Sequence, residues 1–311
     1  MKKLFISMLA VAALASCSNE QTLELNPGEA ISFGNAFIEN ATRATDPTYG
    51  ANALTSFDVY GAVTGTAGTV NIYDGAAVTG EVGANVWSCA VNQYWIAGAS
   101  YKFAAVVDAN AVAQDTYGIP TALTYATAGQ KDLLYAEATA TGKASGNGKV
   151  NFTFSHLLSK AQFTVKSNTE SGYYYSVKNI KVNNFATGTY TIDGGSWAGA
   201  TATDIAFGDI KNVTATATAT DGLTNATQML LIPTTADFTV SFTVELWNGD
   251  GDEDEDDVKL STQAYSKTVS QDLVKGCAYD FNLNLTVGEL IQFTVTSNPT
   301  WAAETDVNVT L

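Results

Sequence analysis

The sequence has little arginine, histidine, cysteine and proline: its 311 residues include one arginine, one histidine, three cysteines and five prolines. Its formal charge is −16, from 15 basic and 31 acidic residues. This balance excludes a nucleic-acid-binding surface, which requires clustered lysine and arginine. The cysteines are too few for a disulfide framework and lack zinc-ligand spacing. We interpret Cys89 and Cys277 as buried free thiols, and a disulfide between them stays open.

The chain has a single histidine, His156, which restricts the catalytic mechanisms that the sequence can support. A Ser–His–Asp triad would need this imidazole beside a nucleophile in a cleft. The nearest nucleophile-elbow pattern is GGSWAG (194–199), which lacks the final glycine. No glycine-rich phosphate loop is followed by lysine, and paired carboxylates, although they are assembled in space, are not indicated. We therefore predict a structural histidine and a protein that is not an enzyme, with no cofactor and no metal.

The acidic run DGDEDEDD (250–257) is the one candidate calcium loop. Read as an EF-hand loop from Asp250, its sixth position is Glu255 instead of glycine and its twelfth is Ser261 instead of glutamate. We interpret the run as a solvated hairpin tip, and weak adventitious calcium binding stays open.

Strand patterns fill most of the chain, and no long stretch has helical periodicity. Phenylalanine, valine and leucine alternate with threonine, serine and glutamate over residues 238–246, which indicates a strand with one buried face. Polar turn residues at 167–172 (SNTESG) divide the strands into two halves. We predict an all-β fold of two antiparallel β-sandwiches in tandem, over residues 44–168 and 169–288.

The first 17 residues are typical of an export signal. A basic MKK precedes an apolar segment that is too short to span a bilayer, and the segment ends in LASC. This ending resembles the lipobox of bacterial lipoproteins, in which the cysteine, here Cys17, receives a lipid anchor (palmitate). Residues 18–43 would then form a propeptide that contains the first strand.

Both ends of the remaining chain offer a strand with a period-two apolar face. The first strand would bury Ile31, Phe33 and Phe37. The last strands, within residues 289–311, would present these apolar residues: Ile291, Phe293, Val295, Val307, Val309 and Leu311. If the first strand were removed, its sheet edge would become a template for a terminal strand of another copy. Such a head-to-tail contact propagates into a filament.

Several segments, taken in order, resemble the type V fimbrillins, the major pilus subunits of Gram-negative gut and oral bacteria. They are Cys17 with its lipobox, TFSHLLSKAQFTV (153–165), LLIP (230–233), GCAYDFNLNL (276–285) and the strand pair of 289–311. The resemblance implies two transthyretin-like β-sandwich domains with a C-terminal donor-strand extension. It also implies export as an outer-membrane lipoprotein precursor that becomes part of an extracellular pilus used in adhesion and colonisation.

In that family an arginine-specific protease cuts after the first strand, and C-terminal strands then complement the neighbouring subunit. Carried onto this chain, the cut falls between Arg43 and Ala44, and Arg43 is the only arginine. The implied partners are other copies or related pilins, the protease, and the membrane through the precursor's lipid alone.

The alternative is a monomeric surface lipoprotein, a tip or accessory adhesin that binds glycans or a host ligand. Its stacking platforms would be exposed aromatic side chains, for which the candidates are Tyr173, Tyr174, Tyr175, Trp197 and Trp247.

Overall fold

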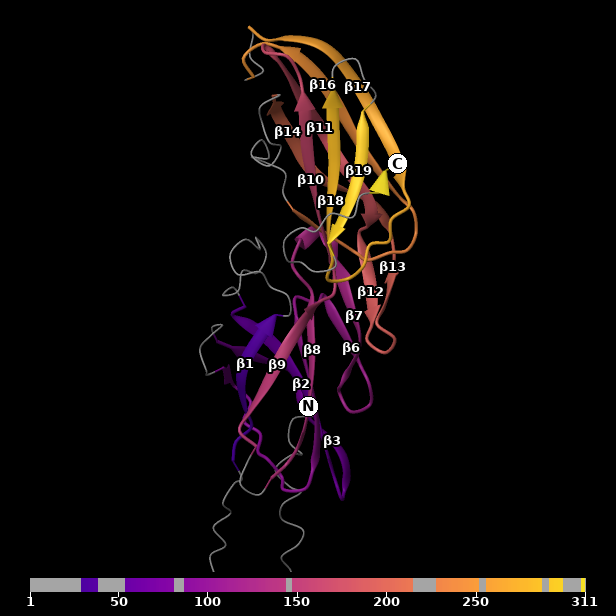
Figure 1. The fold of residues 1–311 in the computed structure, drawn as a ribbon. Coiled ribbons are helices and arrows are strands. Elements are labelled where there is room, and N and C mark those ends of the chain that lie inside the picture. Colours follow the sequence, from indigo (N-terminus) through magenta and orange to yellow (C-terminus); the bar gives the residue numbers. More distant parts are fainter. Residues whose placement is uncertain are drawn as a thin grey trace, which may run out of the picture.

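A computed structural model describes residues 29–38, 54–80, 87–143, 147–214, 228–251, 256–286 and 291–298 and the backbone of 309–310. Over these residues the fold is all-β, as predicted, with four sheets and a single 3₁₀ turn at Thr127–Gly129. Figure 1 shows an elongated molecule with the N-terminal strands at one end and the C-terminal strands at the other. We call these two ends the first and the second unit.

The first unit is built on one seven-stranded sheet. In spatial order its strands are β1 (Ser32–Ile38), β9 (Lys149–His156), β8 (Leu134–Thr141), β5 (Ser100–Val107), β2 (Ser56–Gly65), β3 (Gly68–Thr79) and β4 (Ser88–Cys89). Neighbouring strands are antiparallel except β1 and β9, which run parallel. Side chains on one face of this sheet form the first core.

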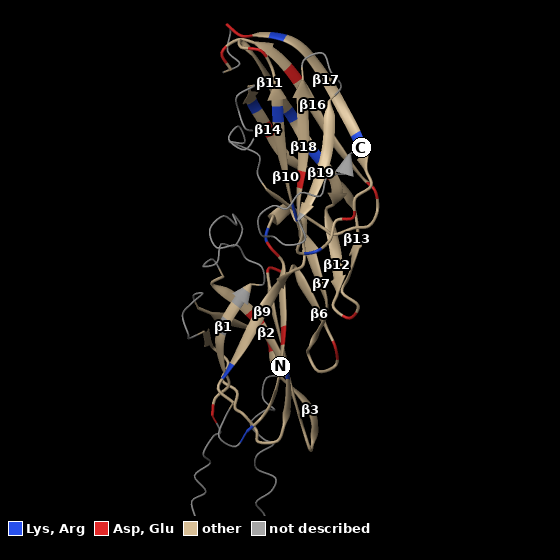
Figure 2. Cartoon of the chain, in the orientation of Figure 1, with Lys and Arg blue, Asp and Glu red and all other residues tan. Residues whose placement is uncertain are grey.

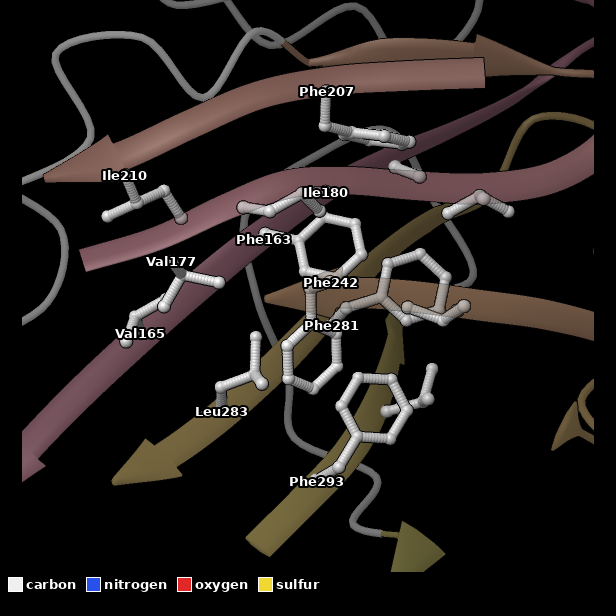
Figure 3. Close-up of a cluster of buried hydrophobic side chains, with 14 of the residues drawn as sticks. Phe163, Val165, Val177, Ile180, Phe207, Ile210, Phe242, Phe281, Leu283 and Phe293 are labelled. Carbon is white, nitrogen blue, oxygen red and sulfur yellow. The ribbon is translucent and has the colours of Figure 1, made fainter. Parts of the chain in front are cut away.

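The second unit is a sandwich of two sheets. One sheet contains β15 (Met229–Leu231), β10 (Ser159–Asn168), β18 (Ala278–Thr286), β19 (Gln292–Asn298) and β20 (Val309–Thr310). The other contains β14 (Ala202–Val213), β11 (Tyr173–Phe185), β16 (Phe238–Asn248) and β17 (Val258–Val269). Figure 3 shows Phe163, Phe281 and Phe293 of the first of these sheets meeting Ile180 and Phe242 of the other in the second core.

Strand β16 follows the predicted alternation from Phe238 to Val244, but Glu245, predicted on the wet face, is 6% exposed, and Leu246 is only partly buried. Phe238, Val240, Phe242 and Val244 are buried in the second core, and the residues between them are partly exposed. Each inward side chain contributes roughly 1.5–3 kcal/mol when it leaves water, which explains why period two fixes the orientation of this strand.

A fourth sheet joins the two units. Its strands are β13 (Ser196–Gly199), β12 (Thr187–Thr191), β7 (Pro120–Ala126) and β6 (Ala111–Gln114). Here β12 of the second half pairs antiparallel with β7 of the first half, from Thr187↔Ala126 to Thr191↔Ala122. A third core, which includes Leu157 and Leu158 from the crossing between units, lies against the other face of the first sheet.

The strand pairing corrects the expected domain boundary after residue 168. Strand β10, assigned above to the first sandwich, pairs with β15 and β18 in the second unit. The turn residues at 167–172 connect β10 to β11, which belong to opposite sheets of the same sandwich. Turn chemistry is the same whether a turn joins two sheets or two domains, so it did not distinguish them.

Charged residues are dispersed over the described surface. Figure 2 shows lysines interspersed with acidic residues along the strands, and acidic residues at several strand ends. No helix of the described residues is long and apolar enough to cross a membrane.

Candidate functional site

The single histidine is a buried structural residue at the end of β9. Its Nδ1 lies 2.6 Å from Oδ2 of Asp132, and the two residues are 4% and 0% exposed. The described residues contain no group of three or more His, Cys, Asp or Glu side chains arranged to hold a metal ion.

Strand β1 is hydrogen-bonded on both of its edges. One edge pairs parallel with β9, from Ser32↔Lys149 to Ile38↔Phe154. The other edge bonds to residues 87–95: Ile31 N–H donates to the Gln93 carbonyl (2.7 Å), and Trp95 N–H donates to the Glu29 carbonyl (3.0 Å). A bridge between Phe33 and Trp87, just before β4, brings the two ends of the seven-stranded sheet together. We therefore call residues 29–38, which are β1 and the three residues before it, the closing strand, and its place between β9 and residues 87–95 the slot.

The closing strand fills the centre of the first core. Ile31, Phe33 and Ala36 are 6%, 1% and 3% exposed. The Phe33 ring lies within 5.6–6.5 Å, centroid to centroid, of four other rings. These rings belong to Phe57, Tyr73, Phe103 and Phe152. Because aromatic pairs add to simple burial, Phe33 is the principal anchor of the strand.

A bulge modifies the even spacing predicted for β1. The register shifts between Phe33↔Val150 and Ala36↔Phe152, so three steps on β1 match two on β9. Gly34 lies in this bulge, where a Cβ would come within 2.3 Å of Asn151 Oδ1. The side chain of Phe37, predicted as the third anchor, lies outside the described residues, and Ala36 occupies the core at this point.

The predicted donor residues near the C-terminus fall into two groups. Strand β19 pairs along its length with β18, and Phe293 and Val295 are 9% and 2% exposed in the second core. Ile291 packs against the same core. Among the described residues, strand β20 pairs with β19 at Thr294↔Thr310 and Val295↔Val309. Val307, Leu311 and the side chain of Val309 lie outside the described residues.

The predicted processing residues also lie outside the described residues. These are Cys17, Arg43 and Ala44. Their flanks are placed: β1 ends at Ile38 opposite Phe154, and the next described residue, Leu54, is buried in the first core. Residues 39–53 therefore connect two points that are both fixed in the first unit.

Most of the candidate stacking aromatics are engaged in the fold. Tyr174 is 1% exposed and stacks on Trp247 at 6.1 Å, while Tyr175 is in the second core. Trp247 also has Lys178 and Lys259 ammonium groups 5.5 and 4.9 Å from its ring. The remaining two, Tyr173 and Trp197, are half-buried, and Trp197 also donates to the Leu157 carbonyl (2.7 Å).

No sequence pattern indicated the residues that form the slot. Tyr73, Phe103 and Phe152 are separated widely along the chain, and Trp87 and Gln93 lie in a segment without a strand pattern. One linear signal exists: no charged residue occurs between Glu81 and Lys102, in a chain with 46 charged residues. That stretch contains the far edge of the slot.

The comparisons with known proteins agree with the fold and decide the family. A family model described as fimbrillin-like matches residues 42–299. The chain belongs to the fimbrillin-like family. The predicted resemblance is thereby confirmed, although the matched range includes neither β1 nor β20 of this fimbrillin. A search of curated proteins returned no match in sequence.

Solved structures of similar fold include proteins from three Bacteroides species. A fimbrial protein of Bacteroides vulgatus is 16% identical with a TM-score of 0.63, over 87% of this fimbrillin and 99% of that chain. Candidate cell adhesion proteins of Bacteroides uniformis and Bacteroides ovatus have TM-scores of 0.53 and 0.55 at 19% and 17% identity. They cover 88% and 89% of this fimbrillin, and 99% of each of those chains is covered. At such identities the likeness supports the fold alone.

Proposed function

We propose that this fimbrillin is a structural subunit of a cell-surface pilus and polymerises by strand exchange after its closing strand is cut off. The observation that carries the proposal is the combination of two properties in β1. Its side chains fill the first core and both its edges are bonded, yet its chain continues into residues 39–53, which contain the only arginine.

Removal of residues up to Arg43 would open the slot. The backbone of β9 would lose its parallel partner, the Gln93 carbonyl and the Trp95 N–H would lose theirs, and the ring of Phe33 would leave a cavity among four aromatic rings. Unpaired backbone groups and exposed apolar surface are both costly in water. A strand from a second copy would pair these backbone groups and cover this apolar surface again, which is the driving force of β-augmentation.

We assign the donor role to the tail after β19, residues 299–311. Strand β19 is itself part of the second core, so its withdrawal would expose Phe293 and Val295, at roughly 1.5–3 kcal/mol for each side chain. Strand β20 is attached to β19 by only two described residue pairs. The tail carries Val307, Val309 and Leu311, a period-two set that suits a core once occupied by Ile31, Phe33 and Ala36.

The precursor is proposed to be a lipoprotein with its lipid on Cys17, held at the outer membrane until an arginine-specific protease cuts between Arg43 and Ala44. The copies then join head to tail, with other copies of this chain or related pilins as partners, in a fibre that serves adhesion and colonisation. Function requires no catalytic step by the subunit itself.

The test uses the purified precursor with and without an arginine-specific protease, followed by gel electrophoresis in SDS without boiling. We expect ladders after cleavage only. Arg43→Ala is expected to give none, and deletion of residues 299–311 is expected to give folded, cleaved monomers. Ladders from the uncleaved precursor, or from the tail-deleted protein, would contradict the proposal. If cleaved protein stays monomeric, the alternative of a monomeric adhesin is favoured.

A further inference from the structure

The far edge of the slot carries an apolar surface that the first unit does not use. We call residues 87–99 the lip. Trp87, Trp95 and Ala99 of the lip point inward and are 2–5% exposed. In contrast Val91, Tyr94 and Ile96 are 40%, 45% and 58% exposed. Eight large apolar side chains are exposed over the described residues, and the lip holds three of them within six positions.

Hydrogen bonds from the first unit hold the lip in this form. Ile96 N–H donates to the Tyr101 hydroxyl (2.7 Å), which donates in turn to the Tyr94 carbonyl (3.3 Å). The N–H groups of Gly98 and Gly142 donate to the carbonyls of Gly142 and Ala99, at 2.8 and 2.7 Å. The exposed side chains are thus presented by a fixed backbone, and the loop is not free to fold them inward.

We propose that the lip is a docking surface for the body of the neighbouring copy, beside the slot that receives its tail. This inference rests on the proposed function. It assigns a second contact to the same joint, made by the outward side chains of Val91, Tyr94 and Ile96 with the copy that donates the tail.

Three observations select a second copy as the occupant. The lip is continuous with the slot, because the residues next to its exposed side chains bond to the closing strand at Glu29 and Ile31. The cleaved subunit, residues 44–311, keeps 12 basic and 27 acidic residues, a formal charge of −15, so a contact between copies is favoured where it adds no further like charge. The lip meets that condition, since residues 82–101 contain no charged side chain.

The second unit supplies a matched control. Before β18, Val274 N–H donates to the Tyr279 hydroxyl (2.7 Å), which donates to the Asp272 carbonyl (2.8 Å), with the same spacing as in the lip. Val274 occupies the position of Ile96 in this turn and is 48% exposed. The residue before it, Leu273, bridges to Thr234, an internal residue, so this turn borders no removable strand.

The test compares a lip variant, Val91→Ser with Tyr94→Ser and Ile96→Ser, with Val274→Ser and the wild type. The substituted side chains are exposed, so all three proteins are expected to unfold at the same urea concentration. Each is cleaved at Arg43, and the dissociation rate of the assembled joint is measured after dilution. A synthetic peptide of residues 299–311 is titrated separately into cleaved subunits that lack their own tail.

We expect the lip variant to bind the peptide as the wild type does, and its joints to dissociate at least tenfold faster. Val274→Ser is expected to match the wild type in both measurements. Equal dissociation rates for all three proteins, an equal effect of Val274→Ser, or weaker peptide binding by the lip variant would each overturn the lip as a body contact. Failure of wild-type cleaved protein to bind the peptide or assemble would overturn the proposed function itself, and the lip contact with it.

Discussion

The first strands of the two units are held in different ways. Strand β1 runs parallel to β9, and β10 runs parallel to β18, so each unit begins with a strand beside a later strand of its own sheet. The pairing of β10 continues without a register shift from Lys160↔Ala278 to Asn168↔Thr286, whereas the pairing of β1 is interrupted by a bulge. Strand β10 also follows β9 almost directly, through Leu157 and Leu158 of the third core.

The difference teaches what makes a core strand removable. Both strands place a phenylalanine at the centre of a core, Phe33 in one unit and Phe163 in the other, at 1% and 0% exposure. Burial therefore does not distinguish them. The distinction lies in the connection, because β10 is tied into sheets at both ends, while residues 39–53 with Arg43 separate β1 from β2.

The largest expected effect is on stability, from Phe33→Ala and Phe163→Ala. Removing either ring from its core is expected to lower the free energy of unfolding by about 3–5 kcal/mol in the precursor. After cleavage at Arg43, the closing strand that carries Phe33→Ala is expected to leave its subunit faster than the wild-type strand, whereas Phe163→Ala keeps its full effect in the mature subunit. Urea unfolding of the precursor and of the mature subunit, with chromatography to follow release of the strand, measures these effects. Equal release of the wild-type and Phe33→Ala strands would break the comparison.

A smaller effect is expected from Gly34→Val in the bulge of the closing strand. The new Cβ would meet Asn151 Oδ1 at 2.3 Å and Lys149 Cβ at 2.9 Å, so the precursor should lose about 1–3 kcal/mol. Asn151→Ala removes the nearer contact and is expected to restore part of the loss. Thermal unfolding of the two single variants and the double variant tests this. If the stability losses of the two single variants simply add in the double variant, residues 34 and 151 do not interact, and the close contact between the bulge and β9 is contradicted.

A smaller effect, which depends on pH, is expected in the second unit alone. Burial raises the pKa of the Glu245 carboxyl, but hydrogen bonds from Lys259 (2.7 Å) and Lys178 (2.9 Å) outweigh it and lower that pKa below its ordinary value of 4.5. A lowered folded-state pKa contributes stability above pH 4.5 that is lost as the pH falls through the folded value.

Glu245→Gln should remove this contribution and so lower the free energy of unfolding at neutral pH. The part of the pH dependence that comes from residue 245 should disappear. Unfolding of the wild type and the variant at pH 7 and pH 3 measures the difference. A difference between the two proteins that is as large at pH 3 as at pH 7 would contradict this assignment.

The smallest expected effect is a change of thiol reactivity on removal of β1. Burial raises the pKa of both Cys89 and Cys277, so both thiols should react slowly with an alkylating reagent in the precursor. Cys89 lies in β4, beside the bridge between Trp87 and Phe33, and packs against the first core. Cleavage is expected to speed alkylation of Cys89 several-fold and to leave Cys277 unchanged, as followed by mass spectrometry. Equal changes at both thiols would argue against a local opening.

The sequence predicted those structural features that are determined by residues close together along the chain. Alternation over residues 238–246 predicted the buried face of β16 as far as Val244, and the apolar pattern around Ile31 and Phe33 predicted a strand there. The bulge at Gly34 was not predicted, because its cause is the proximity of Asn151 on another strand. Similarly, alternation at Phe293 and Val295 predicted a strand but not which core it enters.

Features that depend on distant pairing were beyond the sequence. The parallel partnership of β1 with β9 and the crossing of β12 to β7 join segments more than sixty residues apart. Nothing in the local pattern of either strand selects its partner, since backbone hydrogen bonds are alike for all residues. The domain boundary was misplaced for the same reason, because β10 has a strand pattern that suits either unit.

The central claim is that the tail of a neighbouring copy replaces the closing strand. The most direct test mixes two variants, each of which can form only one side of the contact. One is cleaved at Arg43 but lacks residues 299–311, so it has an open slot and no tail. The other is Arg43→Ala with its tail intact, so its slot stays closed. Light scattering after chromatography of the mixture is predicted to show a one-to-one complex that grows no further. No complex, or the same complex when the first variant is left uncleaved, would contradict the claim.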